Sequence, residues 1–193
     1  DGPMTKVPMA AVSLKSLRGF VFGILRAMGV PEEEAEIFGS ALIFSELRFH
    51  PGHGQGVKKL RRYQSRFAEG GIDPAAPWEI LKESPALALV SANNGIGTVA
   101  ATRAMRLAIE KSKVCGIGQV IVRDSTHFGS SAVHACLGPK TGCIGIAMTN
   151  AGPEMAPWGG REGVVGTNPW GIAVPTGLGF PAVLDIALTT AGK

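Results

Sequence analysis

The chain has 193 residues, 45% of them hydrophobic, which is enough for one domain or two small ones with an ordinary core. Its 27 glycines favour the tight turns and close backbone approaches of a small-molecule enzyme over a pure interaction scaffold. No apolar run approaches the roughly 20 residues that cross a bilayer, and no signal-peptide pattern is present. We therefore predict a cytoplasmic protein with no membrane partner.

Three amphipathic helices are predicted in the first seventy residues. The first begins after the N-cap candidate Ser13, carries apolar residues at helical spacing and ends at Gly29. The second follows Pro31, has three glutamates in its first turn and runs to about Glu46. Its expected buried side chains are Ala35, Phe38, Ala41, Leu42 and Leu47.

An irregular polar segment, residues 48–56, separates the second helix from the third. The buried stripe of the third helix is expected to be Val57, Leu60, Tyr63 and Phe67. Gly70 and Gly71 end this helix. Residues 12–76 are therefore predicted to form an N-terminal helical domain.

Strands and helices alternate in the rest of the chain. Strands are predicted at 86–92, 117–122, 144–148, 171–174 and 182–186, and helices at 98–113 and 132–137. This alternation predicts a mixed α/β domain over residues 77–193. Because the sequence stops directly after a strand and a polar turn, we expect the native chain to continue.

The three cysteines, Cys115, Cys136 and Cys143, form no CxxC pair and are odd in number. This pattern disfavours both a disulfide framework and a zinc site, and reduced cytosolic thiols are the simplest interpretation.

Two of the four histidines, His53 and His127, lie in glycine-rich polar loops. An imidazole titrates near neutral pH, so either ring could move a proton, and the glycines would let a ligand approach the backbone. The alternative is a loop histidine whose ring is satisfied by backbone carbonyls, and both interpretations stay open. His134 falls on a predicted short helix and is expected to be structural.

Patterns for binding metals and phosphates are incomplete. His50 and His53 have a ligand-like spacing, but no Cys, His or carboxylate cluster lies near them in the sequence. Gly95-Ile96-Gly97 precedes a helix but is not a GxGxxG motif, and no acidic residue stands in the expected place. We predict no metal and no standard Rossmann fingerprint, with Gly95 to Gly97 forming a turn and a helix start.

A basic cluster occupies the predicted third helix: Lys58, Lys59, Arg61, Arg62 and Arg66. Such a cluster could bind nucleic acid, but no aromatic platform accompanies it. The favoured interpretation is a solvated helix face beside a site for an anionic small molecule, and no nucleic-acid partner is predicted.

A long loop rich in glycine and proline runs from Gly152 to Pro169. Loops of this length are usually functional or disordered, and Trp158 and the prolines favour an ordered one. Thr167 and Asn168 offer a hydroxyl and an amide to a polar ligand.

Several different short motifs are spread along the whole chain. They are Glu46-Leu47-Arg48, His53-Gly54, Gly70-Gly71-Ile72-Asp73-Pro74, Asn94-Gly95, Ser125-Thr126-His127-Phe128-Gly129, Ile144-Gly145-Ile146-Ala147-Met148-Thr149-Asn150, Ala156-Pro157-Trp158-Gly159-Gly160, Gly166-Thr167-Asn168-Pro169 and Leu184-Asp185-Ile186-Ala187. In this order they resemble the malate/L-lactate dehydrogenase family that is distinct from the Rossmann-type enzymes. That family includes ureidoglycolate, sulfolactate and diketogulonate enzymes and reductases of cyclic imino acids.

The resemblance implies a non-Rossmann NAD(P)-binding α/β domain, a separate N-terminal helical domain and a homodimer. It implies reversible hydride transfer between NAD or NADP and a small 2-hydroxy or 2-keto acid. Two alternatives remain: a reductase of a cyclic imino acid, and a non-catalytic fragment or subunit that needs another chain.

The resemblance also assigns site residues. His53 matches the family's proton donor and acceptor, and His127 matches the histidine taken as the base in ureidoglycolate-type members. Substrate contacts are expected from Arg48, Lys58 and Thr167. Cofactor contacts are expected from His127, Phe128, Gly129, Ser130, Ser131, Asp185, Ile186 and Ala187.

The sequence departs from the family pattern around His53. Gly52 stands where the family often has a serine that orients the histidine ring. Gln55-Gly56 resembles an insertion, and Lys58 stands nearest to the position of a carboxylate-binding arginine. A lysine lacks the bidentate fork of arginine. Residues 189–193 are shorter than the pattern, and family members are longer, so further cofactor contacts are expected beyond this sequence.

Overall fold

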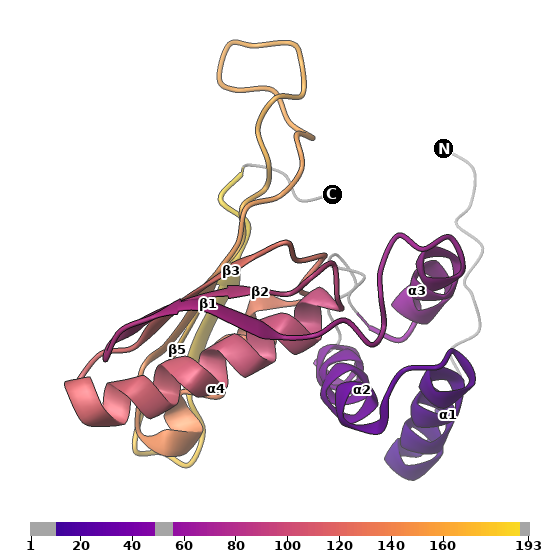
Figure 1. Cartoon of the computed structure of the whole chain (residues 1–193), viewed down its shortest axis with the longest axis horizontal. Helices are drawn as coiled ribbons and strands as arrows, with labels where there is room; N and C mark the ends of the chain where they lie inside the picture. The colour runs from indigo at the N-terminus through magenta and orange to yellow at the C-terminus, as the bar shows by residue number, and fades with distance from the viewer. Residues whose placement is uncertain (1–10, 49–55, 190–193) are drawn as a thin grey trace.

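In the computed structural model, which describes residues 11–48 and 56–189, three helices lie beside a part built from sheets and helices (Figure 1). The helices are α1 (Leu14–Ala27), α2 (Glu32–Leu47) and α3 (Lys59–Ala68). Ser13 caps α1 as predicted, because its side chain accepts a 3.1 Å hydrogen bond from the Ser16 N–H. The three predicted helices are confirmed.

The core of these helices extends into the sheet-containing part. Its buried members include Leu25, Phe38, Leu42, Leu60 and Tyr63, together with Ile96 and Val99 from the start of α4 (Gly97–Cys115). The expected burial of Leu47 is wrong, because the side chain of this last residue of α2 is 59% exposed.

The first sheet has the strand order β1-β2-β3. Its strands are β1 (Glu79–Glu83), antiparallel to β2 (Leu87–Ser91), and β3 (Gln119–Arg123), parallel to β2. Helix α4 connects β2 to β3 and is tied to β1 by the buried Lys111, whose ammonium lies 2.8 Å from a Glu83 carboxylate oxygen. The β1 strand was not predicted, because all five residues are exposed and carry no apolar alternation.

The second sheet contains three antiparallel strands that were predicted at nearly these bounds. They are β4 (Gly145–Met148), β5 (Trp170–Val174) and β6 (Ala182–Ile186). One face packs on the short helix α5 (Ser131–Ala135), which is followed by η1 (Pro139–Thr141). A Cβ at Gly171 would lie 2.6 Å from the Ser131 Cβ, so the absence of a side chain there permits this packing. The opposite face exposes Ile146, Met148, Trp170, Leu184 and Ile186.

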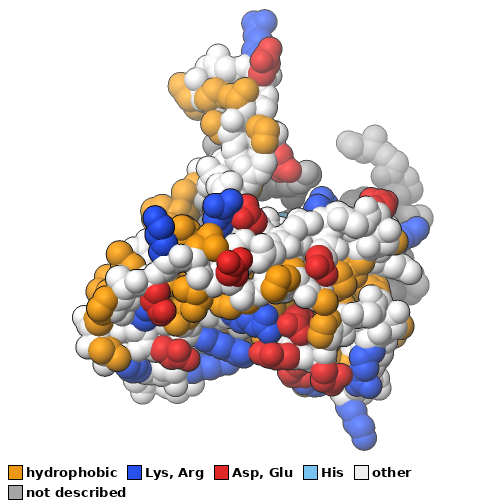
Figure 2. Space-filling view, viewed as in Figure 1, with side chains coloured by type: hydrophobic (Ala, Val, Ile, Leu, Met, Phe, Trp, Pro, Cys, Tyr) orange, Lys and Arg blue, Asp and Glu red, His pale blue; other side chains and the backbone are white. Residues whose placement is uncertain are grey.

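An arm formed by residues 153–166 stands away from the body between β4 and β5 (Figures 1 and 2). Two backbone hydrogen bonds of 3.0 Å pair Met155 with Val165 and give the arm its shape. Trp158 was expected to hold this loop in place, but its side chain is fully exposed and does not anchor the arm. At its base, the Asn168 amide oxygen accepts a 2.9 Å hydrogen bond from the Ala151 N–H.

The mixed α/β prediction is confirmed by this architecture. The division at residues 76 and 77 and the non-Rossmann character of the cofactor domain stay predictions.

Candidate active site around His127

The loop that carries His127 follows β3 and rests on the first turn of α4. The Thr126 hydroxyl donates to the Gly95 carbonyl at 2.8 Å and accepts from the Gly97 N–H at 3.0 Å. A Cβ at Gly97 would overlap the carbonyl groups of Thr126 and His127, so only glycine allows this contact. The Gly97 N–H is thereby used inside the protein, which agrees with a turn and helix start rather than a phosphate loop.

Two hydrogen bonds fix the backbone and the ring of His127. The buried Tyr63 hydroxyl, from α3, donates to the His127 carbonyl at 3.1 Å. The Gly129 N–H donates to Nδ1 of the ring at 3.2 Å. A neutral imidazole that accepts at Nδ1 carries its proton on Nε2. Because His127 is exposed, this Nε2–H is available to a ligand.

A groove beside His127 is lined by Lys59, Arg62, Tyr63, Arg66 and Ile72. The three cations come from one face of α3, at spacings of three and four residues. Desolvation, and after it the positive charges of Lys59, Arg62 and Arg66, together lower the pKa of His127 to about 4. The ring is therefore neutral at pH 7 and can donate a hydrogen bond without adding charge.

His134 lies on α5, behind the same loop, and is fully buried. Its Nε2–H donates to the Phe128 carbonyl at 2.7 Å, and the Thr102 hydroxyl donates to Nδ1 at 3.2 Å. Burial lowers the pKa of His134 to about 4. Both ring nitrogens are occupied, so His134 holds Phe128 in place and presents no group to a ligand.

The two segments that were predicted to bind the cofactor meet in the structure. The Ser130 hydroxyl donates to the Asp185 carboxylate at 2.5 Å, and the Ala132 N–H donates to the same oxygen at 3.0 Å. Ser131 is buried, and its hydroxyl has no hydrogen-bond partner among the described residues. The side chains of Ser130 and Asp185 therefore hold the two segments together.

A nicotinamide dinucleotide carries phosphates, a ribose and an amide, and needs cations and hydrogen-bond donors at its site. The exposed Nε2–H of His127 and the three cations of the groove fit these needs. Ile186 is exposed on the strand that carries Asp185 and offers an apolar contact. Ser130 and Asp185 fit as supports of the loop, because their polar groups are bonded to each other.

The remaining predicted site residues lie at different places. The Thr167 carbonyl accepts a 2.9 Å hydrogen bond from the Leu188 N–H, which puts Thr167 beside residues 185–187. Arg48 stacks on Phe44, with its guanidinium 3.4 Å from the ring centroid. Lys58 is exposed at the start of α3 and is not among the residues that line the groove.

His53 lies outside the described residues, as do His50 and Gly52, so the proton-transfer assignment stays a prediction. Among residues 11–48 and 56–189, no three His, Cys, Asp or Glu side chains gather as a metal site would require. None of the helices in that part of the chain is long and apolar enough to cross a membrane.

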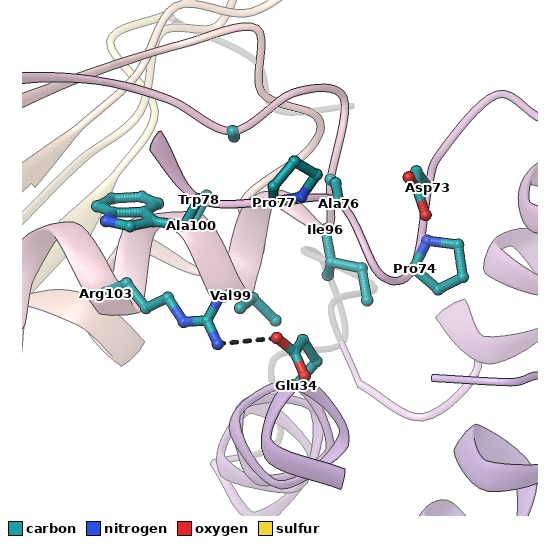
Figure 3. Close-up of a pocket in the computed structure, with 12 residues that line it drawn as sticks. Glu34, Asp73, Pro74, Ala76, Pro77, Trp78, Ile96, Val99, Ala100 and Arg103 are labelled. Atoms are coloured by element: carbon teal, nitrogen blue, oxygen red, sulfur yellow. Dashed lines mark hydrogen bonds and ion pairs between the residues drawn. The ribbon is translucent and has the colours of Figure 1, made fainter. Parts of the chain in front are cut away.

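A second pocket lies between α2, α4 and the segment 73–78 (Figure 3). Arg103 of α4 points toward Glu34 of α2 and forms ion pairs with Glu34 at 2.8 Å and with Glu33 at 3.1 Å. Trp78 lines the same pocket. Because Glu34 and Asp73 outnumber Arg103 in its lining, this pocket lacks the excess of positive charge found in the groove beside His127.

Sequence reasoning missed the grouping of Lys59, Arg62 and Arg66 around His127. Their spacing of three and four residues could have indicated this grouping, since they share a helix face with Tyr63, which was expected to be partly buried. The sequence alone did not show which loop that face contacts.

Comparison with known proteins identifies the family of the chain. Residues 12–193 match the family model described as malate/L-lactate dehydrogenase. A malate dehydrogenase of Pyrococcus abyssi is 43% identical over 171 residues, which are 89% of this chain and 46% of that protein. The chain thus spans about half the length of the curated relatives it matches.

Solved structures give the same result. The structure of malate dehydrogenase from Pyrococcus horikoshii OT3 superposes with a TM-score of 0.88 at 39% identity, over 92% of this chain and 50% of that one. A Δ1-piperideine-2-carboxylate reductase from Pseudomonas syringae superposes with a TM-score of 0.86 at 25% identity, over 95% and 55%. This chain belongs to the malate/L-lactate dehydrogenase family.

Proposed function

We propose that the complete protein transfers hydride reversibly between NAD or NADP and a small 2-hydroxy or 2-keto acid. One observation carries the proposal within this family. The two segments expected to hold the cofactor, 127–131 and 185–187, are joined by the Ser130–Asp185 hydrogen bond beside the exposed ring of His127. Loops at strand ends are where α/β proteins place their sites.

When bound, the nicotinamide supplies the hydride chemistry. In this proposal His53 accepts the hydroxyl proton in the oxidative direction and returns it in the reductive direction. General acid–base help of this kind contributes about 10² to 10⁴ in rate. Arg48, Lys58 and Thr167 are proposed to contact the substrate.

His127 has a different part in the proposal. Its ring is neutral at pH 7, with a pKa lowered to about 4, and its proton is held on Nε2 by the Gly129 N–H. It therefore donates a hydrogen bond to an oxygen of the cofactor or the substrate. Phe128 and Gly129 shape the backbone at the same place, and Ile186 and Ala187 contact the cofactor from the second segment.

The proposal extends to the whole protein. We propose a homodimer in the cytoplasm, with residues 12–76 as a helical domain and residues 77–193 as part of a non-Rossmann cofactor domain. The three cysteines are free thiols in the structure, which supports a reducing compartment.

The experiment is a substrate panel on the complete protein, followed by nicotinamide absorbance. It pairs each 2-hydroxy or 2-keto acid with both cofactors. We expect turnover with at least one acid, and a loss of about 10²-fold or more in His53→Asn. Turnover of none of the acids would contradict the proposal, and full activity in His53→Asn would remove the proton role from His53.

A cyclic imino acid reductase is the second candidate. The structural similarity to the piperideine-carboxylate reductase favours it, because a C=N bond next to a carboxylate could occupy the same site. Including cyclic 2-imino acids in the panel separates the two candidates. Reduction of the imine with no turnover of hydroxy acids would replace the first proposal by the second.

A further inference from the structure

The groove beside His127 has an excess of positive charge, and the proposed function does not say which ligand group it binds. Lys59, Arg62 and Arg66 all line it, whereas none of the described residues in its lining is acidic. Neither Arg62 nor Arg66 forms an ion pair with a carboxylate of the described residues, whereas Arg103 lies 2.8 Å from Glu34. The groove therefore keeps a positive potential that an anion would neutralise.

The two arginines are positioned differently in this groove. The Arg66 guanidinium donates to the Gly71 carbonyl at 3.2 Å, which fixes the direction of its remaining N–H groups. Arg62 is exposed and lies one turn earlier on the same face. Guanidinium groups suit carboxylate, sulfonate and phosphate oxygens, because their N–H groups form a planar fork.

The neighbours of the arginines complete a small polar site. His127 offers its Nε2–H, and Ile72 and the buried Tyr63 form the apolar wall. The Tyr63 hydroxyl is already bonded to the His127 carbonyl, so it does not compete for a ligand. Six of the described residues line the groove, and this set suits one acid group.

We propose that Arg62 and Arg66 bind one oxyanionic group of a ligand next to His127. The identity of the ligand rests on the proposed function. The oxyanion belongs either to the second acid group of a dicarboxylate or sulfonate substrate or to the 2′-phosphate of NADP. Both sources present the same chemistry to the groove.

The first test measures binding without catalysis. Sulfate, a dianion at every working pH, is titrated calorimetrically into the complete protein at low salt, with acetate as the monoanionic comparison. We expect sulfate to bind more tightly than acetate, and Arg62→Gln and Arg66→Gln each to weaken sulfate by about tenfold. The matched control is Arg61→Gln, an exposed neighbour on α3 outside the groove lining, with less than a twofold change.

The second test separates the two sources of the oxyanion by steady-state kinetics on the same variants. A larger rise in KM for malate than for lactate assigns the groove to the substrate, and a larger rise for NADP than for NAD assigns it to the cofactor. Unchanged sulfate affinity in both arginine variants, or an equal loss in Arg61→Gln, would overturn the inference. Sulfate binding without any turnover would instead contradict the proposed function alone.

Discussion

His127 and His134 stand seven residues apart and are both neutral at pH 7, yet their surroundings are opposite. Desolvation is the largest cause of the lowering of both pKa values to about 4, although His127 keeps an exposed surface and His134 is fully buried. His134 uses both ring nitrogens inside the protein, on Thr102 and Phe128. His127 uses only Nδ1 and points an exposed ring toward a groove with three cations.

The comparison shows that a lowered pKa alone does not identify a functional histidine. A neutral ring becomes useful when one nitrogen is held by the protein and the other is left to a ligand. We infer that His134 stabilises the loop that carries His127, and that His127 donates a hydrogen bond to a ligand. The following experiments compare the two, from the largest expected effect to the smallest.

The largest expected effect is on stability at His134. His134→Ala removes a buried ring and leaves the Phe128 carbonyl without its 2.7 Å donor, so we expect a loss of about 3–4 kcal/mol in the free energy of unfolding. His127→Ala should cost less than about 1 kcal/mol, because its ring is exposed. Urea unfolding at pH 7 measures both, and equal losses would contradict the assigned roles.

The next effect is a pH dependence that comes from His134. Its folded pKa of about 4 lies below the ordinary 6.5, so folding favours the neutral ring. This contribution is complete above pH 6.5 and is lost as the pH falls from 6.5 to 4, by about 3 kcal/mol in total. Urea unfolding between pH 7 and pH 4 should show the stability gap between wild type and His134→Asn shrinking, and a constant gap would refute the linkage.

An effect on activity is expected at His127. His127→Asn in the complete protein should lower kcat/KM by about 10- to 100-fold, since it removes one hydrogen bond to a ligand. Thr102→Val, which removes the hydroxyl that donates to His134, should stay within about threefold. Steady-state kinetics with the best substrate of the panel measures both variants. A larger loss of kcat/KM in Thr102→Val than in His127→Asn would contradict the assigned roles.

The smallest effect concerns the tether between α3 and the His127 loop. Tyr63→Phe removes the 3.1 Å hydrogen bond to the His127 carbonyl and should cost about 1 kcal/mol. Burial raises the pKa of Tyr63 to about 12, so the hydroxyl remains a donor at any working pH. Amide exchange of residues 126–131 should become faster in this variant. Unchanged exchange would mean that the loop does not depend on α3.

Much of the secondary structure could be predicted from local signals. The Ser13 cap and the apolar spacing located α1, and short apolar runs located β4, β5 and β6. The strand β1 could not be found, because its five exposed residues show no apolar pattern. Its place depends on pairing with β2, which is a tertiary contact.

The site was only partly predictable for a similar reason. The loop of His127 was identifiable from its glycine and its position after a strand. Its contact with α3 depends on Gly97, which lets the loop rest on α4, and on the reach of Tyr63 across 64 positions of sequence. The pairing of Ser130 with Asp185 spans 55 positions and follows from the packing of α5 on the second sheet.

The most direct test of the account is an NMR titration of the two histidine rings in the complete protein, with and without saturating sulfate. We expect both rings to titrate well below pH 6.5 without sulfate, with the His127 proton on Nε2. Sulfate should raise the pKa of His127 by about one unit, because it neutralises the cations of the groove, and should leave His134 unchanged. An unchanged pKa of His127 in sulfate, or an equal shift in the pKa of His134, would contradict the account.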